Sequence, residues 1–266
     1  MKARIMLGLT LAALLALPQW SQAQESPELG PLASVSYWDI DPADMGTFMT
    51  SVEKVVKAAH AANLPKEYGW SMWQDMYTVV IVGDFNKAEL DDPEHWMKQF
   101  MGTPGEATLM AAFQEMDGVD WLGGSSEISQ YMPGWSYEPE GWQPYMAWVR
   151  VHEFWVKSGQ ENQQKWNALI PEFMAFFKDI GYPYPVWGQM VRYGDNRNMF
   201  VTAYDNPSDY MGDHSAEALA AKHGKSQKWQ DLLMRLSQLT RKGETSDLQF
   251  LAAQSYLPEM EETGSK

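Results

Sequence analysis

The chain has 266 residues, with 20 Lys and Arg against 35 Asp and Glu, and a formal net charge of −15 at pH 7. An acidic surface of this kind repels phosphate backbones, which argues against a nucleic-acid partner. The chain contains no cysteine, which excludes disulfides, thiolate catalysis and cysteine-ligated metal or iron–sulfur sites.

The N-terminal residues have the pattern of a secretory signal peptide. Lys2 and Arg4 precede a short apolar run from Ile5 to Leu17, and residues 21–23, Ser-Gln-Ala, place small side chains where a signal peptidase cuts. We expect residues 1–23 to be removed and the protein to be periplasmic or secreted, which suits a cysteine-free chain. A membrane anchor is the alternative, but the run is shorter than the ~20 residues of a spanning helix. No membrane span is expected after cleavage.

Residues 24–140 are predicted to form one unit of strands and helices. A β-rich run at residues 32–40 precedes a segment with helical period at residues 44–62. Two strand-like runs, "YGWSMWQDM" and "YTVVIVGDF", are close enough to form a hairpin. A helical region from about 93 to 116, interrupted at "GTPGE", and a strand in "SSEISQYMP" complete the unit.

Residues 141–266 repeat this order. "PYMAWVRVHEFWV" is predicted to be a strand, and a helix with an apolar stripe runs from residue 159 to about 180. "PVWGQMVRY" and "NMFVTAYDN" supply a second hairpin, and one long helix is expected over residues 215–242. The closing strand is predicted in "SDLQFLAAQSYLP", and its Tyr-x-Pro is matched with that of "SQYMP" as the end of each last strand.

An ordered set of matching residues supports an internal duplication. The matched pairs are Trp38 with Trp155, Pro65 with Pro183, Trp70 with Trp187, Asp84 with Asp205, and Pro133 with Pro258. Each copy has the β-α-β-β-α-β order of a ferredoxin-like unit, whose bare sheet face must be buried. The predicted fold is therefore α+β, with two tandem ferredoxin-like βαββαβ repeats packed sheet to sheet as an intramolecular α+β barrel.

This tandem pattern resembles the dimeric α+β barrel superfamily, with two units fused in one chain. The run "RVHEFWVKSGQENQQKW" and the terminal "SYLP" resemble the NIPSNAP-like group within it. The resemblance implies a cavity between sheet and helices or inside the barrel. It does not imply one chemistry, because members include cofactor-free monooxygenases, haem-degrading and haem-peroxidatic enzymes, and proteins without known activity.

The strand "WVRVHEFWV" holds the candidate catalytic residues. Alternation places Trp148, Arg150, His152 and Phe154 on one face. His152 is a candidate general acid or base, and Arg150 is a candidate to hold an anionic or enolate-like oxygen. The alternative is that Arg150 pairs with an acidic residue and His152 is a structural histidine. The predicted ligand-binding residues are Trp148, Phe154, Trp187, Gln189, Tyr37 and Tyr256.

The sequence leaves a cofactor open. In haem-handling relatives the resemblance implies an axial histidine on a helix that faces the sheet, and His223 is the candidate here, unless it lies in a solvated kink beside Gly224. No metal site is expected, since neither His-x-x-x-His nor His-Glu-x-x-His occurs. No Gly-x-Ser-x-Gly elbow and no phosphate-binding glycine loop occurs either.

The expected function is that of an exported α+β barrel protein binding a small apolar or aromatic ligand. One alternative is a cofactor-independent monooxygenase or a haem-binding or haem-degrading oxidoreductase. Another is a non-catalytic stress or interaction protein. The duplication supplies a pseudo-dimer within one chain and leaves a homo-oligomer open.

Overall fold

The computed structural model describes residues 28–258, apart from residue 93 and residues 143–146. The predicted signal peptide, residues 1–23, lies outside the described residues. Among the residues described, no helix combines the length and apolar character that crossing a bilayer requires.

The first half of the chain forms strands and helices in the predicted β-α-β-β-α-β order. The helical region after the hairpin is interrupted, as "GTPGE" indicates, and Asn63 ends the first long helix in a left-handed conformation with φ 52°. The elements are β1 (Leu32–Ile40), α2 (Met45–Ala62), β2 (Trp70–Asp75), β3 (Thr78–Asp84), α3 (Ala88–Asp91), α4 (His95–Lys98), α5 (Glu106–Met116) and β4 (Trp121–Tyr131).

The second half repeats this order, with two corrections. The closing strand, predicted over residues 246–258, spans residues 240–250 instead. The single helix predicted over residues 215–242 is wrong: it is divided near Gly224, whose φ is +67°, and the last three residues belong to a strand. Glycine reaches this left-handed conformation without steric cost, so the chain turns there. The elements are β5 (Trp148–Val156), α6 (Gln160–Asp179), β6 (Val186–Tyr193), β7 (Asn198–Tyr204), α7 (Pro207–Met211), α8 (Ala216–Lys222), α9 (Ser226–Leu239) and β8 (Thr240–Phe250).

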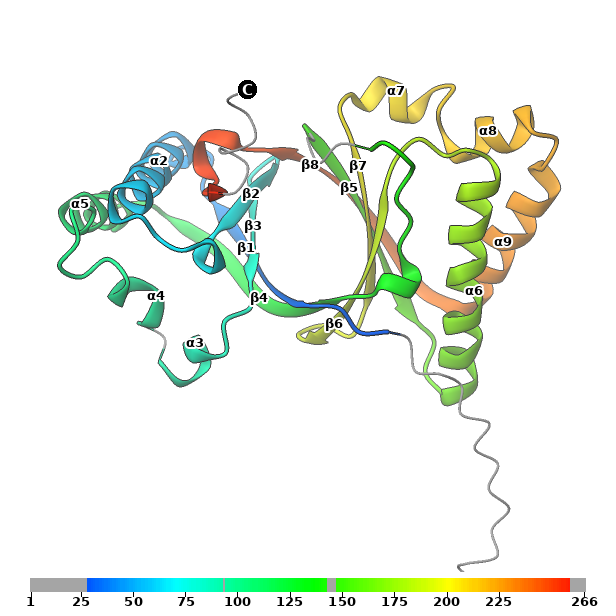
Figure 1. Cartoon of the computed structure of the whole chain (residues 1–266), viewed down its shortest axis with the longest axis horizontal. Helices are drawn as coiled ribbons and strands as arrows, with labels where there is room; N and C mark the ends of the chain where they lie inside the picture. The colour runs from blue at the N-terminus through cyan, green and yellow to red at the C-terminus, as the bar shows by residue number, and fades with distance from the viewer. Residues whose placement is uncertain (1–27, 93, 143–146, 259–266) are drawn as a thin grey trace, which may run out of the picture.

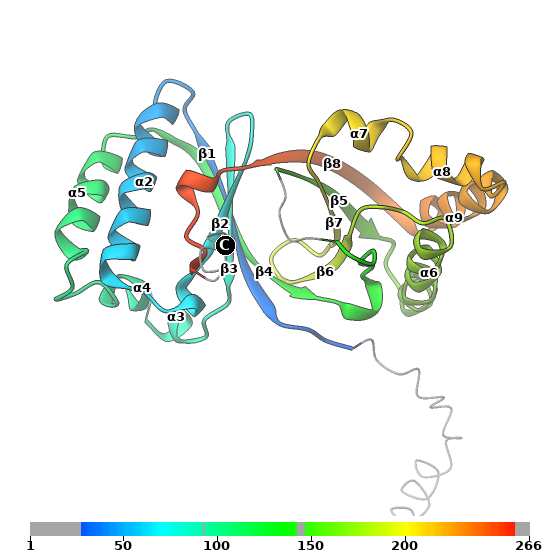
Figure 2. The same cartoon turned by 45° about the horizontal axis from the view of Figure 1, so that its top comes forward.

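The strands of both halves join into one closed antiparallel barrel, which confirms the predicted fold class. Its order is β1-β3-β2-β8-β5-β7-β6-β4. Each half contributes a four-stranded sheet, and the β2–β8 and β4–β6 pairs close the barrel. The helices of the two halves lie on opposite outer sides of it (Figure 1, and turned in Figure 2). Closure leaves no sheet edge for either half to expose.

Each half keeps its own helix-to-sheet core outside the barrel. In the second half, α6 turns an apolar stripe toward the sheet, because its large side chains recur at helical spacing. The fully buried Trp166 of this stripe lies 6.0 Å, ring centre to ring centre, from Phe200 of β7. The predicted boundary at residue 140 lies between β4 and β5.

The strand register corrects the alignment of the two copies by one residue. Each first strand carries a register shift near its end, between Asp39 and Ile40 in β1 and between Trp155 and Val156 in β5. Superposing these shifts pairs Trp38 with Phe154 rather than with Trp155. A slip of one residue exchanges the two faces of a strand, and adjacent aromatic residues hide such a slip in the sequence. His152 therefore corresponds to Ser36, not to Val35.

The repeated Tyr-x-Pro also has a different partner from the predicted one. Tyr131 ends β4, but β8 ends six residues before Tyr256, at Phe250. The counterpart of Tyr256 is Tyr137, because each of these two tyrosines follows a 3₁₀ turn and bridges the second strand of the other half. The motif that repeats is thus Ser-Tyr-x-Pro, at residues 136–139 and 255–258.

These two segments, here called the clasps, hold the halves together reciprocally. In each clasp the serine hydroxyl accepts from a backbone amide of the opposite second strand, and the tyrosine hydroxyl donates to a carbonyl beyond the opposite first long helix. The bonds are Gly188 N to Ser136 Oγ (3.0 Å), Met72 N to Ser255 Oγ (2.8 Å), Tyr137 Oη to Tyr182 O (2.8 Å) and Tyr256 Oη to Leu64 O (2.6 Å).

Candidate functional site

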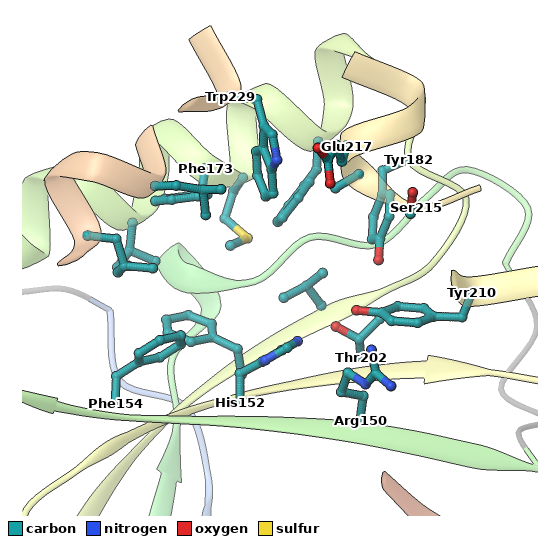
Figure 3. A pocket seen from close by; sticks show the side chains of 18 of the residues that line it. Arg150, His152, Phe154, Phe173, Tyr182, Thr202, Tyr210, Ser215, Glu217 and Trp229 are labelled. Carbon is teal, nitrogen blue, oxygen red and sulfur yellow. The ribbon is translucent and has the colours of Figure 1, made fainter. Parts of the chain in front are cut away.

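A cavity of about 450 Å³ lies between the outer face of the second sheet and the helices that cover it (Figure 3). Strand alternation directs Arg150, His152 and Phe154 of β5 into it from the floor, as predicted for one face of that strand. Most of the remaining lining is apolar. From α6, α9 and β7 it includes Ile170, Phe173, Met174, Phe177, Phe200, Trp229, Leu233 and Leu236.

One end of the cavity is polar. Arg150 makes a bidentate pair with Asp247 of β8, with Nε–Oδ1 2.7 Å and Nη2–Oδ2 2.6 Å. Tyr204 donates its hydroxyl to the same carboxylate at 2.7 Å. The ring of Tyr210 stacks on Tyr204 and lies 4.7 Å from the guanidinium carbon of Arg150. Thr202 and Ser215 also line this end, so hydroxyl groups gather around one compensated ion pair.

The Arg150–Asp247 pair stays ionised. Its hydrogen bonds to Arg150 lower the pKa of Asp247, and the bond from Tyr204 lowers it further. The same carboxylate raises the pKa of Arg150, while burial raises that of the Tyr204 hydroxyl. The polar end therefore holds one compensated ion pair with neutral hydroxyls, and Glu217 adds a carboxylate to the lining.

His152 lies on the floor between the polar end and the apolar part. Its Nδ1 is 3.0 Å from Thr245 Oγ1, and its ring stacks with Phe154 at 6.4 Å. Burial, and then the nearby charge of Arg150, lowers the pKa of His152 to about 4. At neutral pH the imidazole is uncharged, so it offers one donor and one acceptor nitrogen.

The imidazole of His152 is expected to titrate near pH 4 in the folded protein, which NMR of the ring signals can measure. Because the unfolded chain takes up this proton near pH 6.5, the free energy of unfolding should fall as pH decreases from about 6.5 to about 4. His152→Gln, which keeps a partner for Thr245, should flatten this dependence in urea denaturation. An unshifted titration near pH 6.5 would contradict the burial of a neutral imidazole.

The structure separates the other predicted site residues. Trp148 is half-buried on the same face of β5 but does not line the cavity. Tyr37, Trp187 and Gln189 face the inside of the barrel, on the opposite side of the sheet. Tyr256 is buried in a clasp. Only Arg150, His152 and Phe154 of the predicted residues lie together in this cavity.

The sequence did not reveal several residues that line the cavity or support its polar end. Asp247 meets Arg150 only because β5 and β8 pair in the observed register. The expectation that Arg150 pairs with an acidic residue agrees with this contact. Tyr204 lies in "AYDN", at the end of a predicted strand, and Tyr210 follows six residues later. Two tyrosines so close to the end of one strand were the signal in the sequence that could have indicated the polar end. Trp229 lies in the segment predicted as one long helix, residues 215–242.

The first half holds a counterpart cavity of about 440 Å³ with different chemistry. Ser34, Ser36 and Trp38 of β1 occupy the places of Arg150, His152 and Phe154. Its described lining includes no Lys, Arg or His. The ion pair and the half-buried imidazole of His152 thus distinguish the second cavity from the first.

The cavity residues do not fit a haem with an axial histidine from a helix. His223 is exposed at the C-terminal end of α8 and is absent from the lining. His152 is the one histidine among the described lining residues, and it comes from the sheet and contacts Thr245. The described part of the chain also contains no group of three or more His, Asp or Glu side chains suited to a metal ion.

Inside the barrel, a buried ionic cluster joins both halves. Arg197, 8% exposed, donates from Nη1 and Nη2 to the two carboxylate oxygens of Glu127 at 2.7 and 3.0 Å, and from Nε to Glu153. The hydroxyl of Tyr37 donates to Glu127 at 3.1 Å. Burial raises the pKa values of Glu127 and Tyr37. We call these four residues the inner ion cluster.

The sequence matches no family model, and it matches no curated protein. Among solved structures, a putative monooxygenase from Fusobacterium nucleatum is similar, with TM-score 0.52 and 13% identity over 84% of this chain and 93% of that one. A putative monooxygenase from Lactobacillus acidophilus gives TM-score 0.49 and 11% identity over 83% and 94%. Chlorite dismutase from Candidatus Nitrospira defluvii gives 0.42 and 12% over 87% and 95%.

At this identity the likeness to the Fusobacterium nucleatum protein shows the fold and nothing more. Together with the closed barrel of eight strands in the described residues, it establishes the architecture. The chain folds as a closed α+β barrel, with both halves supplied by one polypeptide.

Proposed function

We propose that the second-half cavity binds a small, largely apolar or aromatic ligand that carries one neutral hydrogen-bonding group. The proposal rests on one observation: the cavity has a largely aromatic lining and one polar end, at Arg150 and His152. Pockets for small molecules combine an apolar lining with a few placed polar groups, and about 450 Å³ is of ordinary size for them.

The pairing of Arg150 favours a neutral group over an ionised one. An anionic ligand would compete with Asp247 for the guanidinium and would meet the carboxylate of Glu217, and a cationic ligand would compete with Arg150 for Asp247. A phenol or ketone instead exchanges hydrogen bonds with the Thr202 and Ser215 hydroxyls, which line this end, or with uncharged His152. Its ring then packs against Phe173 and Trp229, which meet edge to face and form part of the roof.

A cofactor-independent oxygenation is a second candidate, since a base and a cation lie side by side. His152 would accept a proton from the substrate, and Arg150 would stabilise the resulting oxyanion. A base whose pKa is about 4 accepts protons weakly at neutral pH. Ligand binding is therefore the stronger proposal. A role without any ligand is favoured less, because the cavity is not filled by side chains.

Export to the periplasm is part of this proposal and depends on residues 1–23. The finer likeness to the NIPSNAP-like group stays a prediction from sequence.

Titration of the cavity with 1-naphthol, naphthalene and 1-naphthoate is expected to give the tightest binding for naphthol. The readout is quenching of tryptophan fluorescence, with Trp229→Phe to assign the signal. His152→Ala should weaken naphthol binding about tenfold, the equivalent of about one hydrogen bond. Arg150→Ala should weaken it by a similar factor, because it leaves Asp247 at the polar end without its cation. Ser36→Ala, at the position matching His152 in the first half, is the control and should change nothing. Indifference of binding to both substitutions would remove the site assignment.

A further inference from the structure

The inside of the barrel encloses a separate chamber of about 380 Å³. The sheet divides it from the second-half cavity, because alternate residues of β5 face opposite sides: Arg150 and His152 outward, Val151 and Glu153 inward. Its walls combine valines with aromatic and acidic side chains from both halves. Besides the valines, they include Tyr37, Trp73, Asp75, Glu153, Trp187, Gln189, Met199 and Leu248.

The charged side chains that line the chamber are all acidic. Asp75 and Glu153 face it, and its described lining contains no Lys, Arg or His. Arg197 is the cation beside Glu153, but Glu127 already engages its Nη1 and Nη2. The inner ion cluster therefore holds two carboxylates against one guanidinium, which leaves one negative charge in excess.

Asp75 adds a further negative charge, which no cation among the described residues compensates. It is half-buried at the end of β2, and it forms no ion pair with any residue that the structure describes. Carboxylates in a partly water-excluded space are stabilised by a nearby positive charge. The chamber thus has a negative potential from two sides.

The indole N–H groups of the two tryptophans in the chamber wall already have acceptors. The indole N–H of Trp73 donates to Ser71 Oγ at 3.0 Å, and that of Trp187 donates to Glu138 Oε1 at 2.9 Å. With these bonds made, what each indole still offers the chamber is its ring. Ring faces attract cations, most strongly organic ammonium groups that shed water readily.

We propose that the chamber binds a small organic cation, a primary or quaternary ammonium compound, between Trp73 and Trp187 with its charge toward Asp75 and Glu153. A metal ion fits less well, because the described residues contain no group of three or more acidic or histidine side chains that could coordinate one. The overall charge of −15 favours the approach of cations to the protein.

Calorimetric titration of the full chain with benzylammonium, benzyl alcohol and benzoate tests this proposal, since the three probes differ chiefly in charge. Benzylammonium is expected to bind about tenfold more tightly than benzyl alcohol, and benzoate more weakly than either. Asp75→Asn should lower the affinity for benzylammonium until it is close to the affinity for benzyl alcohol. Glu153→Gln should act in the same direction, but it also touches Arg197, so Asp75→Asn is the decisive variant.

Asp84→Asn is the matched control, because Asp84 lines the first-half cavity and not the chamber. It should leave amine binding unchanged, and so should Arg150→Ala, which disables the second-half cavity. Loss of naphthol binding with intact amine binding would separate the two sites. Equal affinities for amine and alcohol, or equal effects of Asp75→Asn and Asp84→Asn, would overturn the assignment.

Discussion

Replacement of Arg197 by Met is expected to lower the free energy of unfolding by about 3–5 kcal/mol, the usual cost of removing one partner of a buried ion pair. Glu127 and Glu153 would remain in the barrel without their common cation. Glu127 is 7% exposed, so water cannot replace the lost hydrogen bonds. The loss should appear in urea denaturation followed by circular dichroism.

The free energy of unfolding of Arg197→Met should depend on pH in a definite direction. Without the guanidinium, the pKa of Glu127, already raised by burial, rises further. The folded variant then holds protons that the unfolded chain has released, so its stability decreases as pH rises above the ordinary glutamate pKa. The destabilisation relative to the unmodified protein should therefore be larger at pH 8 than at pH 5.

Arg235→Met is the matched control for this substitution. Arg235 forms a bidentate pair with Glu172 between α9 and α6, but both side chains are more than 40% exposed. Exposed pairs contribute about 0–1 kcal/mol. A similar loss in both variants, or a loss at Arg197 that does not vary with pH, would contradict the role given to the inner ion cluster.

Replacement of Gly188 by Ala is expected to cost about 1–3 kcal/mol by opening one clasp. An added Cβ would lie 2.5 Å from Cβ and 2.7 Å from the carbonyl oxygen of Trp135, a fully buried residue. The backbone of the turn at Pro133–Trp135 must then move away from β6. The hydrogen bond from Gly188 N to Ser136 Oγ would be lost with it.

Gly134→Ala provides the control within the same turn. A Cβ at Gly134 would meet nothing within 4 Å, so the substitution should change stability by less than about 0.5 kcal/mol. Both variants are compared by their urea midpoints and slopes. Equal stability of Gly188→Ala and Gly134→Ala would show that the close contact between β6 and the turn does not contribute to the stability of the fold.

The two cavities show how a duplicated fold acquires one distinctive site. Ser34 and Ser36 in the first half correspond to Arg150 and His152 in the second, while the strand geometry around them is shared. Two substitutions on one strand face therefore change the chemistry of a cavity without altering the packing that creates it. This asymmetry is why the proposed ligand is assigned to the second half alone.

Part of the candidate site could be predicted from β5 alone. The period of two placed Arg150, His152 and Phe154 on one face, and the structure shows all three in one cavity. The same reasoning grouped Trp187 and Gln189 with them, whereas these two residues face the chamber. Alternation shows which residues of one strand share a face, but it does not relate the faces of different strands.

By itself the sequence determined the order of strands and helices in both halves, and hence the α+β class, because the periods of strand and helix are local properties of the chain. Only the tertiary structure decided which residues meet. Arg150 reaches Asp247, 97 positions later, and Tyr137 rather than Tyr131 proves equivalent to Tyr256. Both outcomes depend on how strands of the two halves pair, and that register is chosen by the burial of whole faces rather than by any local pattern.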